Sequence, residues 1–224
     1  MSKESHPETY GPEAPLDCAL CPRLVTFRED NAAAFPDFFN APVPSFGPDD
    51  ARLLIVGMAP GLKGANQTGR PFTGDYAGDL LYATLDEFGF STGTYDKRHD
   101  DGLELVDCMI TNAVRCVPPQ NKPIGAEVNA CRPYLVERIA ALPHLTHICA
   151  LGSLAHNAVL TTLGLRKAPY KFGHNTWYEL GDTGLVMISS YHCSRYNTNT
   201  GRLTAEMFAD VFRAIRMELD QNGV

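Results

Sequence analysis

The feature that most constrains the fold is a set of four short, continuously apolar runs. They occupy residues 53–58, 109–114, 147–151 and 185–190. Apolar runs without alternation are typical of strands in a sheet that is covered on both faces. Each run is followed by an amphipathic helical pattern, and these patterns span residues 78–88, 126–142, 154–163 and 204–219. The alternation predicts an α/β fold with a parallel central sheet and helices on both sides.

The length of the chain, 224 residues, suits one well-buried core. Residues 1–15 are rich in proline, glutamate and serine. We therefore expect a flexible lead-in at residues 1–15 and a single domain over residues 16–224. Residues 35–48 hold four prolines, which predict an ordered but irregular loop.

The composition is that of an ordinary globular protein, with 44% apolar and 20% charged residues. The sequence has no apolar run of membrane-spanning length and no basic, apolar leader, so we expect a cytoplasmic protein without a membrane partner. Seven cysteines in such a protein indicate metal binding or catalysis rather than disulfides. The net charge of −7 weakens a nucleic-acid-binding hypothesis without excluding a local basic face.

Ligands of parallel sheets bind beyond the carboxyl ends of the strands, so the segments after the apolar runs are candidate binding segments. The first of these, residues 57–75, is rich in glycine and allows the backbone to approach a ligand closely. Its large aromatic residue, Phe72, is suited either to stacking on a planar ring or to anchoring the loop in the core. Asp75 precedes a helical pattern and is a candidate N-cap that can also face a water molecule.

Polar side chains also accompany the second and fourth apolar runs. Asn112 lies inside the second run, where its amide needs partners and can pair with the edge of a base. Asn121 lies in a proline-rich turn, where a purely turn-forming role is the alternative. His192 follows the fourth run and is either a donor to a developing anion or a structural histidine. Residues 195–202 are polar, aromatic and basic, which suits contacts with phosphates and bases.

Four cysteines form a candidate metal site. Cys18 and Cys21 make a C-x2-C pair, whereas Cys116 and Cys131 are fifteen positions apart and do not make a second one. Structural zinc sites usually use two tight pairs, so the pattern suits an iron–sulfur cluster on four cysteines somewhat better. From spacing alone, a zinc site and no metal at all both remain open.

The other three cysteines have simpler interpretations. Cys108 and Cys149 lie in apolar strands and are expected to be inert core residues. Cys193 follows His192 directly, which suggests a catalytic pair, but neighbours on an extended chain point to opposite sides.

Taken together, these segments resemble the uracil-DNA glycosylase superfamily, and most closely its iron–sulfur branch, known as family 5 or the B type. The resemblance covers nearly the whole chain. It rests on the four-cysteine spacing and on the motifs GMAPG at 57–61, TGRPFTGD at 68–75, TNAVRCVPPQNKP at 111–123 and SYHCSRYNTNTGRLT at 190–204. Family 4 places an acidic residue in the first motif, where this chain has Met58-Ala59.

The resemblance implies a three-layer α/β/α fold with a small central parallel sheet, a structural [4Fe–4S] cluster and removal of uracil from DNA. B-type enzymes also act on hypoxanthine and on alkylated or etheno bases, mainly in duplex DNA. The family positions that match this chain are cluster ligands at Cys18, Cys21, Cys116 and Cys131, base-holding side chains at Phe72 and Asn112, and catalytic groups at Asp75, Asn121 and His192.

The chain departs from the family pattern at Cys193, because the family usually has proline directly after the motif histidine. Proline fixes φ and removes an N–H group. We therefore expect a more mobile loop at this position than in other members of the family.

The mechanism that these residues allow begins with extrusion of the nucleotide into a pocket. We expect His192 and backbone N–H groups near Ala59 to stabilise the anion of the leaving base, and Asp75 with Asn121 to position water and favour the cationic sugar. Gly57 and Met58, with Ala59, complete the predicted base pocket. The predicted DNA contacts are Arg195, Tyr196 and Asn197, and further candidate phosphate contacts are Lys63, Arg70, Lys122 and Arg202.

The sequence therefore predicts a monomeric DNA glycosylase whose partner is DNA containing uracil or other deaminated bases. One alternative is a glycosylase of the same fold that acts chiefly on hypoxanthine or other damaged purines. A second alternative is a non-catalytic, metal-stabilised nucleic-acid-binding protein.

Overall fold

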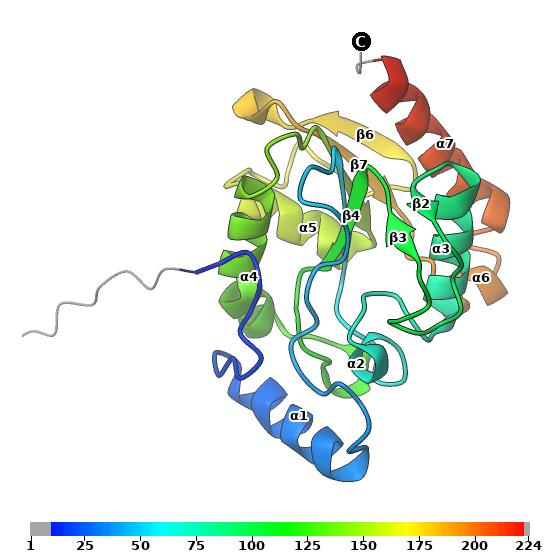
Figure 1. Cartoon of the computed structure of the whole chain (residues 1–224). Coiled ribbons are helices and arrows are strands. Elements are labelled where there is room, and N and C mark those ends of the chain that lie inside the picture. The colour runs from blue at the N-terminus through cyan, green and yellow to red at the C-terminus, as the bar shows by residue number, and fades with distance from the viewer. Residues whose placement is uncertain (1–9, 222–224) are drawn as a thin grey trace, which may run out of the picture.

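The central sheet is the element on which the rest of the fold is built. In the computed structural model, which describes residues 10–221, this sheet has five strands in the order β4-β1-β5-β7-β6 (Figure 1). The parallel strands are β1 (Leu53–Gly57), β4 (Cys108–Asn112), β5 (His147–Leu151) and β7 (Val186–Ser190). The predicted strands are thus confirmed to within two residues at either end.

One edge of the sheet differs from the prediction. The strand β6 (Thr176–Glu179) pairs antiparallel with β7, so the sheet is mostly rather than wholly parallel. Its residues are half-buried or exposed and carry no continuous apolar run, which is why sequence patterning did not reveal it. An antiparallel edge strand is a common end to an otherwise parallel sheet.

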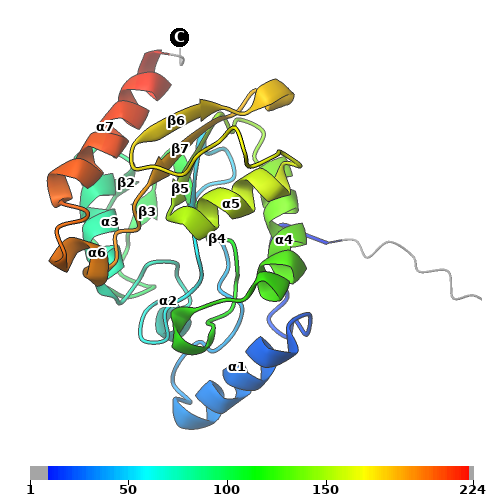
Figure 2. The same cartoon turned by 180° about the vertical axis from the view of Figure 1, so that it is seen from behind.

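Helices cover both faces of the sheet, as the alternation predicted (Figures 1 and 2). One layer holds α3 (Tyr76–Glu87) and α7 (Ala205–Gln221), and the other holds α4 (Gly125–Ala140) and α5 (Ser153–Thr162). Alternate residues of β1 point to opposite faces of the sheet. Leu53 and Ile55 belong to a core on the face covered by α3 and α7, and Leu54 and Val56 belong to a second core on the face covered by α4 and α5. The fold is therefore an α/β/α sandwich.

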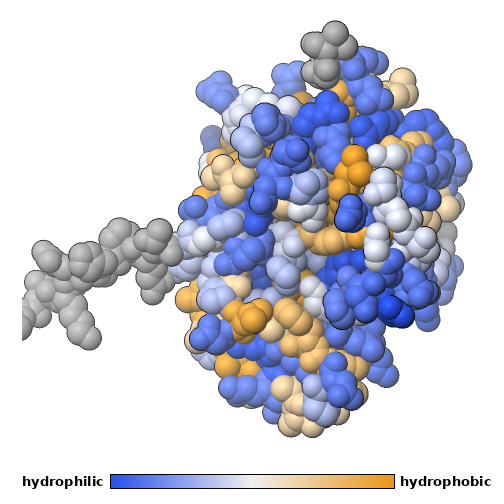
Figure 3. All heavy atoms as spheres, viewed as in Figure 1, coloured by the Kyte–Doolittle hydropathy of each residue, from blue (hydrophilic) through white to orange (hydrophobic). Residues whose placement is uncertain are grey.

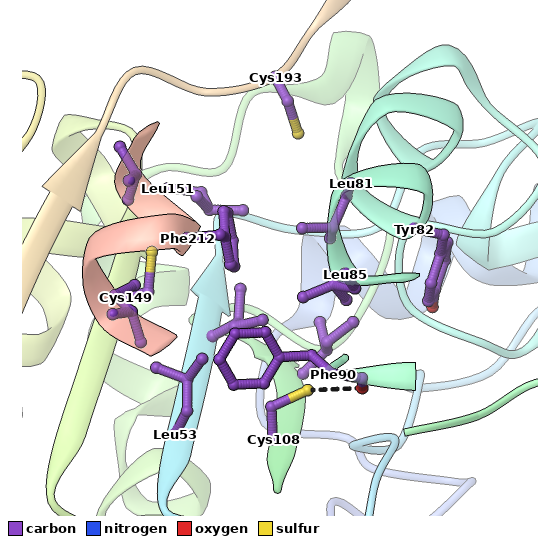
Figure 4. Packing of buried hydrophobic residues seen from close by; sticks show 14 of the residues in the cluster. Leu53, Leu81, Tyr82, Leu85, Phe90, Cys108, Cys149, Leu151, Cys193 and Phe212 are labelled. Atoms are coloured by element: carbon purple, nitrogen blue, oxygen red, sulfur yellow. Dashed lines mark hydrogen bonds between the residues drawn. The ribbon is translucent and has the colours of Figure 1, made fainter. Parts of the chain in front are cut away.

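The first core lies between the sheet and the α3–α7 layer (Figure 4). Phe212 of α7 packs edge-on against Phe90, and the Cys108 thiol donates to the Phe90 carbonyl at 3.4 Å. Cys149 is fully buried in the same core, and burial raises the pKa of its thiol to about 12. Cys108 and Cys149 are thus core residues, as predicted.

Shorter elements complete the chain. They are α1 (Pro22–Ala34), α2 (Ala65–Thr68), α6 (Arg195–Asn199), β2 (Ser91–Thr92), β3 (Glu104–Leu105) and the 3-10 turns η1 (Pro119–Asn121) and η2 (Gly181–Thr183). The helix α1 was not predicted because it buries only Leu24 and Asn31 and so has no apolar stripe. Residues 35–48 form the expected irregular loop, with a single bridge between Phe46 and Ile110.

The face of the molecule in Figure 3 is mainly hydrophilic, with apolar side chains in small groups. None of the helices within residues 10–221 is long and apolar enough to cross a membrane.

The N-terminal segment is tied to the domain by a buried ionic network. Residues 1–9 of the predicted lead-in lie outside the described residues, but Glu13 accepts from Arg115 at 3.1 Å and from Arg138 at 2.6 Å. The Arg115 and Arg138 side chains are 1% and 6% exposed, so Glu13 supplies a carboxylate to the buried Arg115 and shares the buried Arg138 with Asp49.

Replacing Glu13 with glutamine tests this network. The variant Glu13→Gln keeps the side-chain shape but leaves the buried Arg115 without a carboxylate, so we expect the free energy of unfolding to fall by about 2 kcal/mol. Urea unfolding measures this change. Glu29→Gln, which removes an exposed carboxylate on α1, is the matched control and should change stability little; equal stability of the two variants would contradict the assigned role.

Candidate active site

A cleft of about 950 Å³ opens at the carboxyl ends of the parallel strands. Its walls are loops that follow three of the strands: residues 58–64 after β1, residues 151–154 at the end of β5, and residues 191–202 after β7. The start of α3 and Asn121 close its remaining sides. The cleft therefore lies where the sheet topology predicts a ligand site.

Asp75 is held at the edge of this cleft by the first turn of α3. Its Oδ1 accepts from the Gly78 N–H at 3.1 Å, so Asp75 is the N-cap of the helix, as predicted. Its Oδ2 packs on the glycine-rich loop, where a Cβ on Gly64 would lie 2.5 Å from that oxygen and one on Gly61 would lie 3.1 Å away. One carboxylate oxygen is thus used for the cap, and glycine leaves room for the other beside the cleft.

Phe72 and Asn112 converge on Gly57 behind the cleft. A Cβ at Gly57 would lie 2.3 Å from Asn112 Oδ1 and 2.7 Å from the Phe72 ring, so only glycine fits between them. Both side chains are buried and do not line the open cleft. The Phe72 ring stacks near the His192 ring, with centroids 5.7 Å apart and an interplanar angle of 26°. The two predicted base-holding side chains therefore lie together at Gly57, buried and not at the surface of the cleft.

His192 lines the cleft, and its surroundings keep its imidazole neutral. Burial lowers the pKa of His192 below its ordinary 6.5, although the charge of Asp75 opposes the shift. The His192 carbonyl accepts from Asn197 Nδ2 at 2.8 Å, which fixes the backbone on which the ring is carried. A neutral imidazole in this position can donate one N–H to a group in the cleft.

The Cys193 side chain points into the core that also holds Leu81 and Phe212 (Figure 4), as expected for the neighbour of His192 on an extended chain. Its thiol is fully buried and donates to the Ala77 carbonyl at 3.4 Å. A catalytic Cys–His pair is therefore excluded by geometry.

Asn121 is exposed and lines the cleft from the loop between β4 and α4. Gln120 and Asn121 both have positive φ, 56° and 55°, a conformation that asparagine tolerates better than most residues. The turn is braced by Arg23, which donates to the Lys122 carbonyl at 3.1 Å and to both oxygens of Glu127. The predicted turn residue is thus also a cleft residue.

The segment of α6 brings further polar groups to the mouth of the cleft. Arg195 and Asn197 line it, whereas Tyr196 does not line it and is 73% exposed. The Arg195 guanidinium lies 5.4 Å from the centre of the Tyr76 ring. Similarly, Arg202 lies 4.5 Å from the ring centre of Tyr191. Each pair fixes an arginine by cation–π contact.

Tyr76 and Tyr191 were not identified from the sequence. The available signal was their position, since Tyr76 follows Asp75 and Tyr191 precedes His192. Aromatic side chains that flank two candidate site residues at strand ends could have been included on that ground.

The four candidate phosphate contacts have different positions. Lys63 and Arg202 line the cleft, and Lys122 is exposed next to Asn121. The prediction for Arg70 is wrong: its side chain is 4% exposed and both of its terminal nitrogens donate to Asp101 at 2.8 Å. A guanidinium that is buried and fully paired is not available to a phosphate.

The four candidate ligand cysteines line one small cavity between the N-terminal segment, the end of β4 and α4. Burial raises the pKa of Cys116 to about 11 and that of Cys131 to about 12, so these free thiols would be protonated at neutral pH. Donors nevertheless point at the sulfur atoms: the Arg115 N–H lies 3.3 Å from Cys131 Sγ, and Arg28 Nη1 lies 3.6 Å from Cys116 Sγ. Such donors stabilise thiolates when a metal centre displaces the protons.

The four cysteines form one donor set. Within the described residues, no group of three or more His, Cys, Asp or Glu side chains is placed to hold a metal ion. The four cysteines nevertheless line a common cavity, and N–H donors lie near the sulfur atoms of Cys116 and Cys131. This donor set suits a metal centre bound by thiolates.

The lowered pKa values of the histidines predict how stability depends on pH. Burial lowers the pKa of His147, His156, His174 and His192 below 6.5 in the folded protein. As the pH falls below 6.5, the unfolded state takes up protons first, so stability that is present above this pH is lost.

Urea unfolding between about pH 7.5 and about pH 5 should show this loss. The variant His192→Gln removes one of the titrating groups and should make the decline shallower. Replacement of the exposed His144 is the control. A decline equally steep in the wild type and in His192→Gln would contradict the neutral state assigned to His192.

The chain was compared with known proteins. Residues 44–216 match the family model described as "Uracil DNA glycosylase superfamily". A Type-5 uracil-DNA glycosylase from Thermus thermophilus is 45% identical over 87% of this chain and 90% of its own length. A Type-5 uracil-DNA glycosylase from Pyrobaculum aerophilum is 40% identical over 88% of this chain and 87% of its own length. A Type-4 uracil-DNA glycosylase from the same organism is 38% identical over only 55% of this chain.

Proposed function

Because the chain belongs to the uracil DNA glycosylase superfamily, we propose that it is a hydrolase that excises uracil from DNA by cleaving the N-glycosidic bond. The observation that supports this most directly is the convergence of side chains at one cleft. Asp75, Asn121 and His192 reach it from three separate loops, and Phe72 and Asn112 lie together behind Gly57.

In this proposal the base enters through the cleft and is held behind it, where Phe72 and Asn112 meet at Gly57. An extruded base has two aromatic faces and a polar edge, which require a stacking surface and a donor–acceptor pair. The Phe72 ring supplies the surface and the Asn112 amide supplies both kinds of polar atom. Gly57, Met58 and Ala59 form the adjoining wall, where the absence of a side chain at Gly57 lets both groups approach.

His192 stabilises the leaving base. Cleavage of the glycosidic bond places negative charge on the base, and a neutral imidazole has one ring N–H that can donate a hydrogen bond to it. Ala59 lines the same cleft, and backbone N–H groups near it would add to this stabilisation.

Asp75 acts on the other side of the scissile bond. Its carboxylate favours the positive charge that develops on the sugar, and with Asn121 it orients the attacking water. The N-cap contact to Gly78 keeps the carboxylate in place, so no reorganisation is needed during the reaction.

The DNA backbone is bound by polar and cationic groups at the mouth of the cleft in this proposal. Arg195, Asn197 and Arg202 line the mouth, and the exposed Tyr196 beside them is suited to fill the space left by the extruded nucleotide. These groups give a local basic face to a chain whose net charge is −7.

A wider range of bases, including hypoxanthine, is a second proposal. It is supported by the loop at Met58 and Ala59, which lines the cleft and carries no charged or aromatic side chain there. Release of hypoxanthine from duplex DNA is therefore the second activity to assay.

The cofactor in this proposal is a [4Fe–4S] cluster bound by Cys18, Cys21, Cys116 and Cys131. When bound, it supplies a covalent cross-link between the N-terminal segment and the loop that carries Asn121. The fit of the donors supports this: the cysteines share one cavity, and Arg28 and the Arg115 N–H point at their sulfur atoms.

Substitutions at His192 and Asp75 test the catalytic assignment. We expect His192→Ala to slow single-turnover release of uracil by about 10²–10³-fold, because it removes a donor to the leaving anion. Asp75→Asn keeps the helix cap but loses the charge, and should slow release by about 10²-fold. The measurement is cleavage of a labelled duplex after alkaline treatment.

The controls are His144→Ala and Asp86→Asn, which alter exposed residues that do not line the cleft and should retain full activity. If the wild-type protein leaves uracil in place but binds the duplex tightly, the glycosylase proposal is wrong and the chain is a nucleic-acid-binding protein.

The cluster is tested separately from activity. Protein purified without oxygen should be brown, absorb at about 400 nm and contain about four irons per chain. Cys116→Ser should lose most of this absorption and iron, whereas Cys149→Ser, which alters a buried cysteine in the core, should keep both. A colourless wild-type protein that contains zinc would overturn the cluster assignment.

A further inference from the structure

We propose that Tyr95, supported by the buried Arg70–Asp101 ion pair, is a positioning residue that holds the Phe72 ring in place for the extruded base. The inference rests on the proposed function, because it assigns a role in base excision to residues that do not touch the base. It also gives a function to the segment between α3 and β4, which contributes Lys97 to the lining of the cleft.

The first observation is the backbone conformation of Phe72. Its φ is +52°, in the left-handed region that large side chains rarely adopt. Such a conformation persists only where surrounding contacts over-determine it, and it is often found at functional sites. The relevant question is therefore which groups hold the backbone at Phe72.

Two tyrosine hydroxyls hold this backbone directly. The Tyr95 hydroxyl donates to the Phe72 carbonyl at 3.4 Å and accepts from the Gly74 N–H at 3.3 Å. The Tyr82 hydroxyl donates to the Pro71 carbonyl at 2.6 Å. The polar backbone groups on both sides of the Phe72 ring are thus fixed by side chains from α3 and from the segment that follows it.

The buried ion pair fixes the same loop from its start. Arg70 Nε donates to Thr73 Oγ1 at 2.8 Å, and its terminal nitrogens donate to Asp101. Asp101 also accepts from the backbone N–H groups of Asp96 at 2.8 Å and Leu103 at 3.1 Å. The ion pair therefore joins the glycine-rich loop to the segment that carries Tyr95.

Aromatic rings enclose the Arg70 guanidinium on its remaining sides. The ring centres lie 5.1, 5.4 and 5.7 Å from it in Phe46, Tyr82 and Tyr95, and the Tyr82 and Tyr95 rings stack with centroids 4.5 Å apart. This cage replaces water around a buried cation and fixes the Tyr95 ring at the same time. Arg70, which is unavailable to DNA, thus has a role inside the loop.

The loop has no room to relax toward α3. A Cβ at Gly78 would lie 1.6 Å from the Phe72 carbonyl oxygen and 2.7 Å from the Tyr95 hydroxyl, so the helix packs directly on this hydrogen bond. On its other side, the Phe72 ring meets His192 and Gly57. A shift of the Phe72 backbone is therefore transmitted to the ring at the site, where small misplacements are costly for the rate.

The decisive variant is Tyr95→Phe, which removes the hydroxyl and keeps the ring stacked on Tyr82. We expect the single-turnover rate constant for uracil release from a duplex to fall about tenfold, because two contacts to the loop are lost. The reaction amplitude and the Kd for an undamaged duplex should be unchanged. The matched control is Tyr178→Phe, which removes a hydroxyl contact to the Lys171 carbonyl far from the loop and should release uracil at the wild-type rate.

A second variant, Arg70→Lys, keeps the charge but cannot form the two-pronged contact with Asp101. We expect a larger fall in the same rate constant, at least about thirtyfold. The rate constant is measured at a temperature at which a thermal melt shows that the variant is folded.

Each outcome has a distinct meaning. A wild-type rate constant in Tyr95→Phe overturns the positioning role and leaves the proposed function intact. A lower amplitude with an unchanged rate constant shows that Tyr95 supports folding only, and also overturns it. If the wild-type protein itself releases no uracil, the proposed function fails and the inference that rests on it fails too.

Discussion

Parallel pairing of the strands is the constraint on which the structure depends. Because β1, β4, β5 and β7 run in one direction, the loops that follow them emerge at one edge and form one cleft. Helices on both faces bury the strands, which leaves this edge as the place where polar side chains can gather without disturbing the core. Residues as distant in the sequence as Asp75 and His192 meet there for this reason.

The side chains of the site are held in place by hydrogen bonds and an ion pair with residues outside the cleft. Asp75 caps α3, the turn at Asn121 is braced through Lys122 and Glu127 by Arg23, and the Phe72 loop is fixed by a buried ion pair and two tyrosines. Each brace uses groups outside the cleft. Preorganisation of this kind is what an enzyme needs when transition-state stabilisation comes mainly from fixed dipoles and charges.

The N-terminal segment contacts both the segment that follows β4 and the helix α4, which lie on either side of the loop that carries Asn121. Glu13 links it to Arg115 and Arg138, and Cys18 and Cys21 follow within the same segment. Cys116 and Cys131 flank the loop of Asn121, so the candidate cluster site adjoins a candidate catalytic residue. A structural cross-link at this point would act on the site through the backbone and not through the reaction itself.

The sequence by itself determined the strand order along the chain, the cleft loops and the candidate residues, because apolar runs and motifs are local patterns. It missed β6 and α1, which have no continuous apolar run or stripe, and it misassigned Arg70, whose charge and position near the strand ends suggested a phosphate contact. Only the tertiary structure decided that Arg70 is buried against Asp101, that Tyr95 reaches Phe72, and that Phe72 and Asn112 meet at Gly57. Such contacts join residues far apart in the chain, and burial and hydrogen bonding depend on neighbours that packing brings together.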